Sequence, residues 1–348
     1  MSPTPTPVPD RPPFASLPLD PAGPPGNAWG LYGRDDALGA LNMLTPAHVA
    51  ASAAREIRTG ERVSLDWTLD KPSHPSFGRP AFRWQRKVLL DVHGQPRTVN
   101  DDTIEFNTQC SSQWDGFRHY GYQKAKRFYG NVTAEQLDGS NVLGLDAWVE
   151  RGGIVGRGVL LDYAGFCQKH GKTIAPFSST AITVVELEAV ARYQDLELQK
   201  GDILLVRSGC TEAYERLSAT EQKALADRPA PDFIGIAPTI DTLRWMWDCG
   251  FATVAGDAPS FERAPIGGLH TRIGGIWAGE PWEAEMQGGG LLHQWMLAGW
   301  GVPIGELFDL EALARKCVEL HRWSFFVSSV PLKVPGGVAS PPNAIAIF

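Results

Sequence analysis

The sequence between residues 158 and 255 alternates between short apolar strands and amphipathic helices. Apolar runs at 158–163, 202–207 and 251–255 have the length of buried strands, whereas 183–193 and 240–248 have helical periodicity. Strands that are joined through helices pair in parallel, because the helix returns the chain to the same end of the sheet. The pattern therefore predicts an α/β fold that contains parallel sheet.

Further elements are expected on both sides of this region. A helix is predicted at 46–57, because Thr45 can cap it, Pro46 suits its first turn and Gly60 follows its end. The other predicted elements are strands at 63–69, 87–92 and 104–115, helices at 291–298 and 310–320, and strands within 323–348 that residues 335–337 separate.

The N-terminus is expected to form a loose arm. Residues 1–25 contain ten prolines, which exclude a helix and disfavour sheet pairing. The rest of the sequence has no internal repeat and no linker rich in glycine, serine or charge that would divide it. We therefore predict a proline-rich arm at 1–28, packed over a neighbour or free, and one domain at 29–348.

Composition excludes several classes of partner. The 348 residues carry a formal net charge of −7, and the basic residues are scattered singly, so neither nucleic acid nor an anionic membrane is expected to bind. No apolar run reaches the length of a membrane span. The five cysteines are widely spaced and form no CxxC pair, which favours a reducing, cytoplasmic location. A small molecule is the expected partner.

In the segment 104–115 every odd position is polar and most of the even positions are apolar. Read as a strand, one face is apolar and the other carries amides, a hydroxyl and carboxylates, namely Glu105, Asn107, Gln109, Ser111, Gln113 and Asp115. A half-buried strand with one solvated face would show the same alternation. The residues that follow favour a pocket instead, because Asp115, Arg118 and His119 crowd together beside large aromatic residues.

Common catalytic motifs are absent. The glycine spacing in 165–173 differs from that of a phosphate loop, and no Gly-x-Ser-x-Gly elbow or dinucleotide fingerprint occurs. Two further residues are notable. His293 follows a glycine-rich stretch at the predicted start of a helix, and Glu306 is a carboxylate in an apolar setting, where it needs a partner.

From residue 29 onward the chain resembles the cyclase family of metal-dependent hydrolases, which includes kynurenine formamidase and isatin hydrolase. The family signature His-x-Gly-Thr-His-x-Asp-x-Pro-x-His aligns with residues 109–119 and keeps Asp115 and His119, while Gln109 and Gln113 replace two metal-binding histidines. A later Asp-x-x-Ser-x-Asp segment aligns with 257–262. The final His and Glu of the family align with His293 and Glu306, and the stretch 36–46 resembles a branch that carries the glutamines.

The resemblance implies a cyclase-like (swivelling β/β/α) domain with a mixed sheet and flanking helices. It also implies a divalent metal, a metal-activated water that hydrolyses an amide, lactone or cyclic amide bond, and a homodimer or homotetramer. His119 would act as acid/base with Asp115. The implied metal ligands are Gln109, Gln113, Asp115, His293 and Glu306. Because glutamine offers a neutral, hard oxygen, this set favours manganese or magnesium over zinc.

Two other functions stay open on the sequence alone. Without a metal, Asp115 and His119 could serve a lyase or isomerase, or the pocket could simply bind a small molecule. The expected substrate contacts under each interpretation are Trp114, Phe117, Arg118 and Tyr120. For the aromatic members the alternative is ordinary core packing.

Strand geometry limits how this set can be arranged. In a straight strand Gln109 and Asp115 would lie about 20 Å apart, because each residue rises about 3.3 Å, whereas the ligands of one ion must converge. Either the chain bends near Ser111 and Ser112, or only Gln113 and Asp115 reach the ion and Gln109 acts from behind them.

Overall fold

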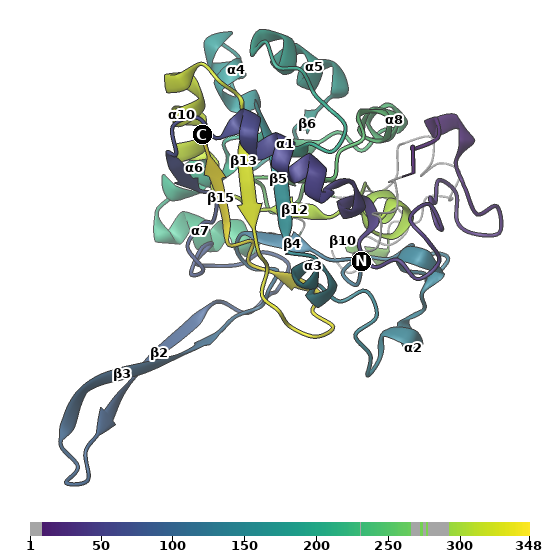
Figure 1. Cartoon of the computed structure of the whole chain (residues 1–348). Coiled ribbons are helices and arrows are strands. Elements are labelled where there is room, and N and C mark those ends of the chain that lie inside the picture. Colours follow the sequence, from purple (N-terminus) through teal and green to yellow (C-terminus); the bar gives the residue numbers. More distant parts are fainter. Residues whose placement is uncertain (1–8, 230, 266–271, 274–275, 278–291) are drawn as a thin grey trace.

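A nine-stranded mixed sheet forms the centre of the molecule (Figure 1). In this computed structural model the sheet has the order β1-β15-β13-β5-β7-β9-β12-β4-β14. Its middle consists of four parallel strands, β5 (Ile154–Asp162), β7 (Ile203–Arg207), β9 (Thr253–Gly256) and β12 (Ile304–Glu306). The structure describes residues 9–229, 231–265, 272–273, 276–277 and 292–348.

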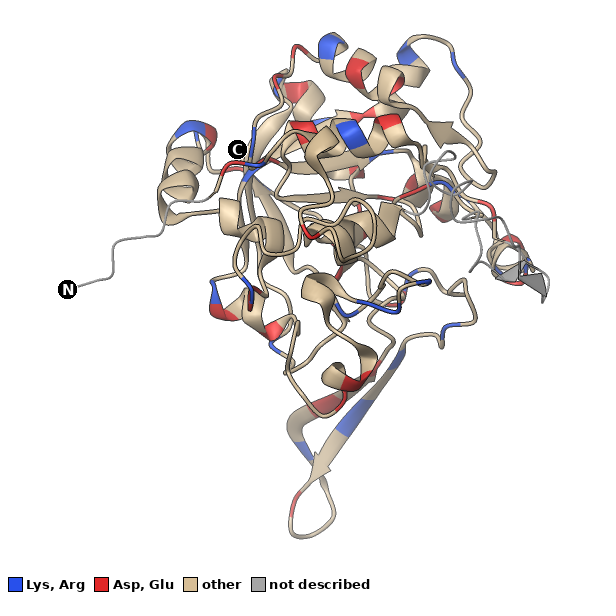
Figure 2. Ribbon diagram, turned by 90° about the vertical axis from the view of Figure 1, so that its right-hand side faces the viewer, with Lys and Arg blue, Asp and Glu red and all other residues tan. Residues whose placement is uncertain are grey.

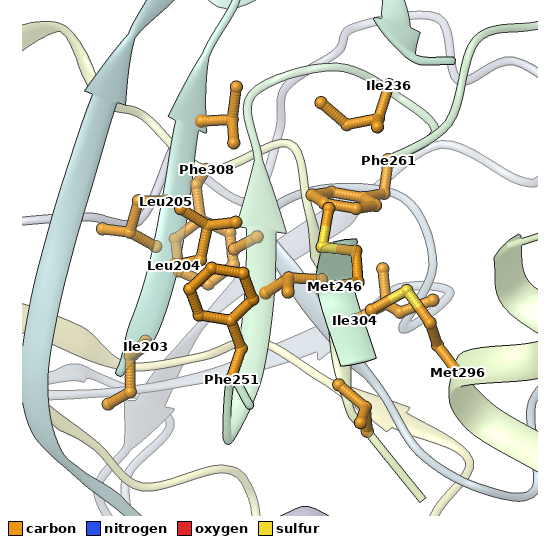
Figure 3. Packing of buried hydrophobic residues seen from close by; sticks show 14 of the residues in the cluster. Ile203, Leu204, Leu205, Ile236, Met246, Phe251, Phe261, Met296, Ile304 and Phe308 are labelled. Atoms are coloured by element: carbon orange, nitrogen blue, oxygen red, sulfur yellow. The ribbon is translucent and has the colours of Figure 1, made fainter. Parts of the chain in front are cut away.

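The parallel strands are buried because helices cover the sheet. The connections contain α4 (Tyr163–Lys169), α5 (Val184–Tyr193) and α8 (Ile240–Cys249). Figure 3 shows Leu204 and Leu205 packed near Phe251 and Phe308 in this core. The predicted parallel sheet is therefore confirmed. Short apolar runs such as those of β5 and β7 are typical of strands that are covered on both faces.

Antiparallel strands extend the sheet on both sides. On one side β5 pairs with β13 (Ser324–Ser329), then β15 (Ala344–Ile347) and β1 (Arg62–Ser64) follow. On the other side β12 pairs with β4 (Gln113–Asp115), which pairs in turn with β14 (Ala339–Ser340). The predicted strands of the C-terminal tail are thus confirmed.

The predicted helices are present with small shifts in their ends. In α1 (Pro46–Glu56) the Thr45 side chain accepts a hydrogen bond from the His48 amide, as expected of its cap. The helix expected at 291–298 is found from residue 292 onward and includes η4 (Gln294–Trp300), which has π-type hydrogen bonds; residue 291 lies outside the described residues. The other elements are α10 (Glu311–Leu320), α2 (Ala134–Leu137), α3 (Asp146–Glu150), α6 (Cys210–Glu215), α7 (Ala219–Ala226), β6 (Ala181–Ile182), β8 (Gly235–Ile236), β10 (Arg272–Ile273), β11 (Ile276–Trp277), η1 (Phe14–Ser16), η2 (Gly39–Met43) and η3 (Tyr129–Asn131).

The prediction of one strand over 104–115 is wrong. Its first residues end β3 (Pro96–Glu105), which pairs only with β2 (Arg83–Leu90) in a hairpin that projects from the body (Figure 1). Its last residues form β4 in the central sheet, and 106–112 between them have no regular structure. Polar alternation continued across the break because both flanking strands have a polar face.

The prediction of a loose N-terminal arm is wrong for residues 9–28. The Arg11 guanidinium donates to the Phe251 carbonyl, the Trp247 indole donates to the Pro12 carbonyl, and the Phe14 ring stacks on Trp295 at 6.1 Å. Apart from the short η1 turn this segment is irregular, and its prolines do not exclude packing of an extended chain on aromatic residues.

The surface charge is mixed and the cysteines are unpaired. In the view of Figure 2, basic and acidic residues are interspersed over the body. All five cysteines are free. Among the described residues, no helix is long and apolar enough to cross a membrane.

A buried ion cluster links α1 to the sheet. Arg157 on β5 donates to Asp202 at 2.7 Å and to Glu56 at 3.2 Å, and all three side chains are buried. Burial raises the pKa of Asp202 to about 6, although Arg157 opposes the shift. Asp202 therefore depends on this guanidinium for compensation of its charge, whereas Glu56 also pairs with Arg55 at 2.9 Å and with Arg322 at 3.7 Å.

Arg157→Ala is expected to lower the free energy of unfolding by about 3–5 kcal/mol, because it leaves the buried Asp202 carboxylate without its ion-pair partner. Denaturant titration followed by circular dichroism would measure the change. The matched control is Arg192→Ala, which removes an exposed ion pair with Glu188 and should change stability by less than about 1 kcal/mol. Equal losses in the two variants would contradict the importance of the buried cluster.

Candidate metal centre

The pairing of β4 with β12 brings three polar side chains together. Gln113 and Asp115 are two residues apart on β4 and therefore face the same side of the sheet. Glu306 on β12 lies directly opposite Gln113, and the Gln113 amide donates to its carboxylate at 2.8 Å. All three side chains are buried.

Gly305 allows the two strands to pack this closely. It lies opposite Trp114 in the register. A Cβ at this position would lie 2.6 Å from the Ala255 side chain and 2.8 Å from the Trp114 indole. The missing side chain thus lets Trp114 fill the opposite face of the sheet, while Gln113 and Asp115 face the site.

The chain bends between β3 and β4, and the bend brings Gln109 to the site. The Gln109 amide nitrogen donates to Asp115 Oδ1 at 2.6 Å, and its oxygen accepts from Gln113 at 3.1 Å. The Arg79 guanidinium holds the bend by donating to the Gln109 carbonyl at 2.6 Å. Of the two arrangements that strand geometry allowed, the structure contains the bend. Both the nitrogen and the oxygen of the Gln109 side-chain amide are hydrogen-bonded, to Asp115 and Gln113. The Gln109 side chain therefore orients these two side chains.

His293 connects three carboxylates. Its Nδ1 lies 2.7 Å from Glu262, and its Nε2 lies 3.1 Å from Glu306 and 3.7 Å from Asp115. The segment that follows β9 supplies Glu262, and the helix that contains η4 supplies the imidazole. A carboxylate on Nδ1 fixes the orientation of a histidine whose Nε2 faces a ligand.

His119 completes the group from the solvent side. It follows β4 in a turn, and its Nε2 lies 3.9 Å from Asp115 Oδ2. One ligand atom from each of Asp115, His119 and His293 lies within 4.8 Å of the others, close enough to hold one ion. The His119 side chain is 19% exposed, whereas Asp115 is fully buried.

Charge and burial oppose each other at these groups. Burial raises the pKa of Asp115, but the His119 and His293 imidazoles outweigh it and hold that pKa below its usual value. Burial together with the Asp115 charge raises the pKa of Glu306. Burial lowers the pKa of His119. For His293 burial is opposed by Glu262, Asp115 and Glu306, which together raise its pKa well above the usual value.

The donor set fits a divalent cation. Asp115 Oδ2 and Gln113 Oε1 are buried and have no hydrogen-bond partner among the described residues, so two oxygen donors are free. A carboxylate and two imidazoles suit several divalent metals, and an added amide oxygen suits the harder ones. A cation would also compensate the carboxylates that converge on His293.

The predicted substrate contacts separate into two groups. Trp114 packs on Phe308 and Phe117 packs on Tyr129, and both predicted residues are fully buried in the core. The Arg118 guanidinium is held by two backbone carbonyls, those of Leu137 and Gly336.

Tyr120 differs from these three residues. Its ring centroid lies 5.8 Å from that of His293 and 6.2 Å from that of His119. We therefore retain Tyr120 alone as a candidate substrate contact.

The five implied ligands, Gln109, Gln113, Asp115, His293 and Glu306, do lie together in one buried network. The residue that sequence reasoning left out of the site is Glu262. Its signal was the last position of the segment 257–262, where the family has an aspartate. Asp257 of the same segment is not at the ligand group; it accepts from the backbone amides of Ser208, Gly209 and Cys210 at the start of α6.

Residues 63–263, more than half of the chain, match the model of a family described as Putative cyclase. A crystal structure described as that of a novel cyclase is 29% identical, has a TM-score of 0.76, and the match covers 92% of this chain and 99% of that one. The predicted cyclase-like fold, with its mixed sheet and flanking helices, is thereby confirmed.

More distant structures share the fold. Isatin hydrolase A from Labrenzia aggregata, bound to benzyl benzoate, is 17% identical with a TM-score of 0.54, over 88% of this chain and 98% of that one. Isatin hydrolase A from Ralstonia solanacearum is 16% identical with a TM-score of 0.56, over 87% and 97%. A search of curated proteins finds no match.

Glu262→Gln is expected to lower the pKa of His293 in metal-free protein, because it removes the largest favourable charge acting on the imidazolium. Titration of the imidazole resonances by NMR would measure the shift. The stability that the raised pKa of His293 contributes is present below about pH 6.5 and is lost as the pH rises through the pKa of the folded state. The variant should therefore be most destabilised on the acidic side. Glu105→Gln on the exposed hairpin is the control and should leave His293 unchanged.

Proposed function

Because the chain belongs to the Putative cyclase family, we propose that it is a metal-dependent hydrolase of a small molecule that carries an amide, lactone or cyclic amide bond. The observation that carries the proposal is the buried and unpartnered Asp115 Oδ2, which lies 3.7 Å from the His293 imidazole and 3.9 Å from that of His119. The similarity of the fold to isatin hydrolases supports the bond class.

We propose that Asp115 and His293 hold the metal together with the Gln113 oxygen. Gln109 fixes Asp115, Glu262 fixes His293, and Glu306 lies between Gln113 and His293. When bound, a divalent cation supplies Lewis acidity that polarises a carbonyl and activates water. We further propose that Gln109 and Gln113 mark a branch of the family in which amides replace two histidines; their neutral oxygens favour manganese over zinc.

We assign proton transfer to His119. Of the three grouped side chains it is the most exposed, so it is the one that a small molecule can reach. Its lowered pKa keeps the imidazole neutral at neutral pH and able to accept a proton from water, which it can then deliver to the leaving nitrogen or oxygen. Tyr120 lies beside the same ring and would contact the substrate.

The first expected outcome concerns the metal itself. Protein purified without chelators should contain about one divalent metal per chain by elemental analysis, because the free oxygen donors and the imidazoles converge. Chelation should abolish hydrolysis of cyclic amides such as isatin, or of lactones and aryl amides, and added Mn²⁺ should restore it. Asp115→Asn should lose both metal and activity, whereas Glu105→Gln should keep both. Full activity in metal-free protein would overturn the proposal.

The second expected outcome separates proton transfer from metal binding. His119→Ala should lower kcat by about 10²–10⁴-fold, the range of general acid–base catalysis, while the metal content stays at the wild-type level. Tyr120→Phe serves as a control, because it keeps the ring beside His119 and should change KM more than kcat. If His119→Ala instead loses its metal, His119 is a ligand and the assignment of proton transfer fails.

A further inference from the structure

The segment that joins β1 to β2 lies beside the bend that brings Gln109 to the site. The Arg79 guanidinium in this segment donates to the Gln109 carbonyl at 2.6 Å, and the Gln109 side chain donates to Asp115 at 2.6 Å. One residue therefore separates the guanidinium from the buried carboxylate. The segment is held in this place, since Ser111 in the bend donates to the Thr68 carbonyl at 3.0 Å.

The Arg79 guanidinium keeps two of its nitrogens for a ligand. Nη1 makes the hydrogen bond to Gln109, whereas Nε and Nη2 have no hydrogen-bond partner among the described residues. Nε and Nη2 lie along one edge of the planar group, and this edge can donate two parallel hydrogen bonds to a carboxylate. Arg79 is half-buried, so such bonds would form partly shielded from water.

The charge of Arg79 acts on the groups of the candidate metal centre. Burial lowers the pKa of His119, and the Arg79 charge acts in the same direction. For Glu306 burial raises the pKa, and the Arg79 charge opposes the rise. Because interactions between charges weaken with distance and with screening by water, the guanidinium lies near both side chains. A molecule bound to Arg79 is therefore close to His119, to which we assign proton transfer.

An exposed aromatic ring stands beside this guanidinium. The central carbon of the Arg79 guanidinium lies 5.1 Å from the centroid of the Phe77 ring, a cation–π contact that helps to orient it. Phe77 is 47% exposed, and its φ of 62° lies in the left-handed region that bulky residues rarely adopt. Backbone outliers of this kind cluster at active sites and at clamps for ligands. The pair therefore suits a ligand that is both aromatic and anionic.

We propose that Arg79 and Phe77 select the substrate of this site, an aromatic molecule that carries a carboxylate beside its amide or lactone bond. The carboxylate binds the Nε and Nη2 edge of Arg79, the aromatic ring packs on Phe77, and the scissile carbonyl faces His119. Arg79 binds substrate in this arrangement and takes no part in proton transfer. The inference rests on the proposed function, because it names the substrate class of the same site.

The test measures binding where no metal-dependent hydrolysis can occur. The full chain is treated with a chelator and titrated calorimetrically at pH 7 with N-acetylanthranilate and with acetanilide, the same aryl amide without the carboxylate. The wild type should bind the acid about 10-fold more tightly or better, because a charge-assisted bidentate pair forms. Arg79→Gln should bind both probes equally, since glutamine can still donate to the Gln109 carbonyl but has no charge. Arg79→Lys should keep part of the preference.

Two further variants separate recognition of the anion from support of the bend. Arg83→Gln removes an exposed arginine four residues along the chain and should keep the full preference for the acid. Phe77→Ala should weaken binding of both probes by about the same factor, because it removes the aromatic contact and leaves the charge. If Arg79 only supports the bend, Arg79→Gln should weaken both probes equally or neither. Circular dichroism shows whether each variant keeps the wild-type fold.

The outcomes for this inference differ from those for the hydrolase proposal. Equal affinity of the wild type for the two probes, a preference that survives Arg79→Gln, or no binding of either probe would each overturn the inference, whatever the hydrolase activity. The hydrolase proposal fails instead on full activity of metal-free protein. That result together with a preference for the acid that Arg79→Gln abolishes would support the anion site and overturn the hydrolase proposal alone.

Discussion

The register between β4 and β12 is the constraint on which the site depends. It sets Gln113 opposite Glu306 and directs Asp115 to the same side of the sheet. A slip by one residue would turn these side chains into the core and bring Trp114 into the site. Trp114 prevents the slip, because its indole fits only against Gly305 and donates to Ser329 at 2.8 Å. Core packing and site geometry are therefore fixed by the same pair of strands.

Glutamine at two positions changes the balance of charge in this site. An amide can donate to one carboxylate and accept from another amide, as Gln109 does between Asp115 and Gln113. Histidines at the same positions would add two nitrogen donors for a metal. With glutamines, the carboxylates are satisfied partly by hydrogen bonds and partly by His293, and the remaining free atoms are oxygens. In the proposed metal site, glutamines in place of histidines would keep the acidic cluster and make its donor set harder.

Local sequence patterns correctly predicted the elements that depend on interactions between residues close together in the chain. Four such elements are present in the structure: the cap at Thr45, the apolar strands at 158–163 and 202–207, and the helix at 240–248. The break inside 104–115 depends on the contact of Arg79 with the Gln109 carbonyl, across 30 residues. Periodicity could not show it. Glu262 lies in the segment 257–262 that the resemblance marked, but only the fold shows that it contacts His293.

The hairpin and the site share one segment of chain. Residues 106–112 leave the hairpin, pass the Arg79 guanidinium and deliver Gln109 to Asp115. Cys110 adds a second anchor, since its thiol donates to the carbonyl of Pro80 on the other side of the hairpin root. Both anchors therefore hold the root rather than the arm beyond it. The hydrogen bond from Gln109 to Asp115 therefore depends on the position of the hairpin root, which these two contacts fix.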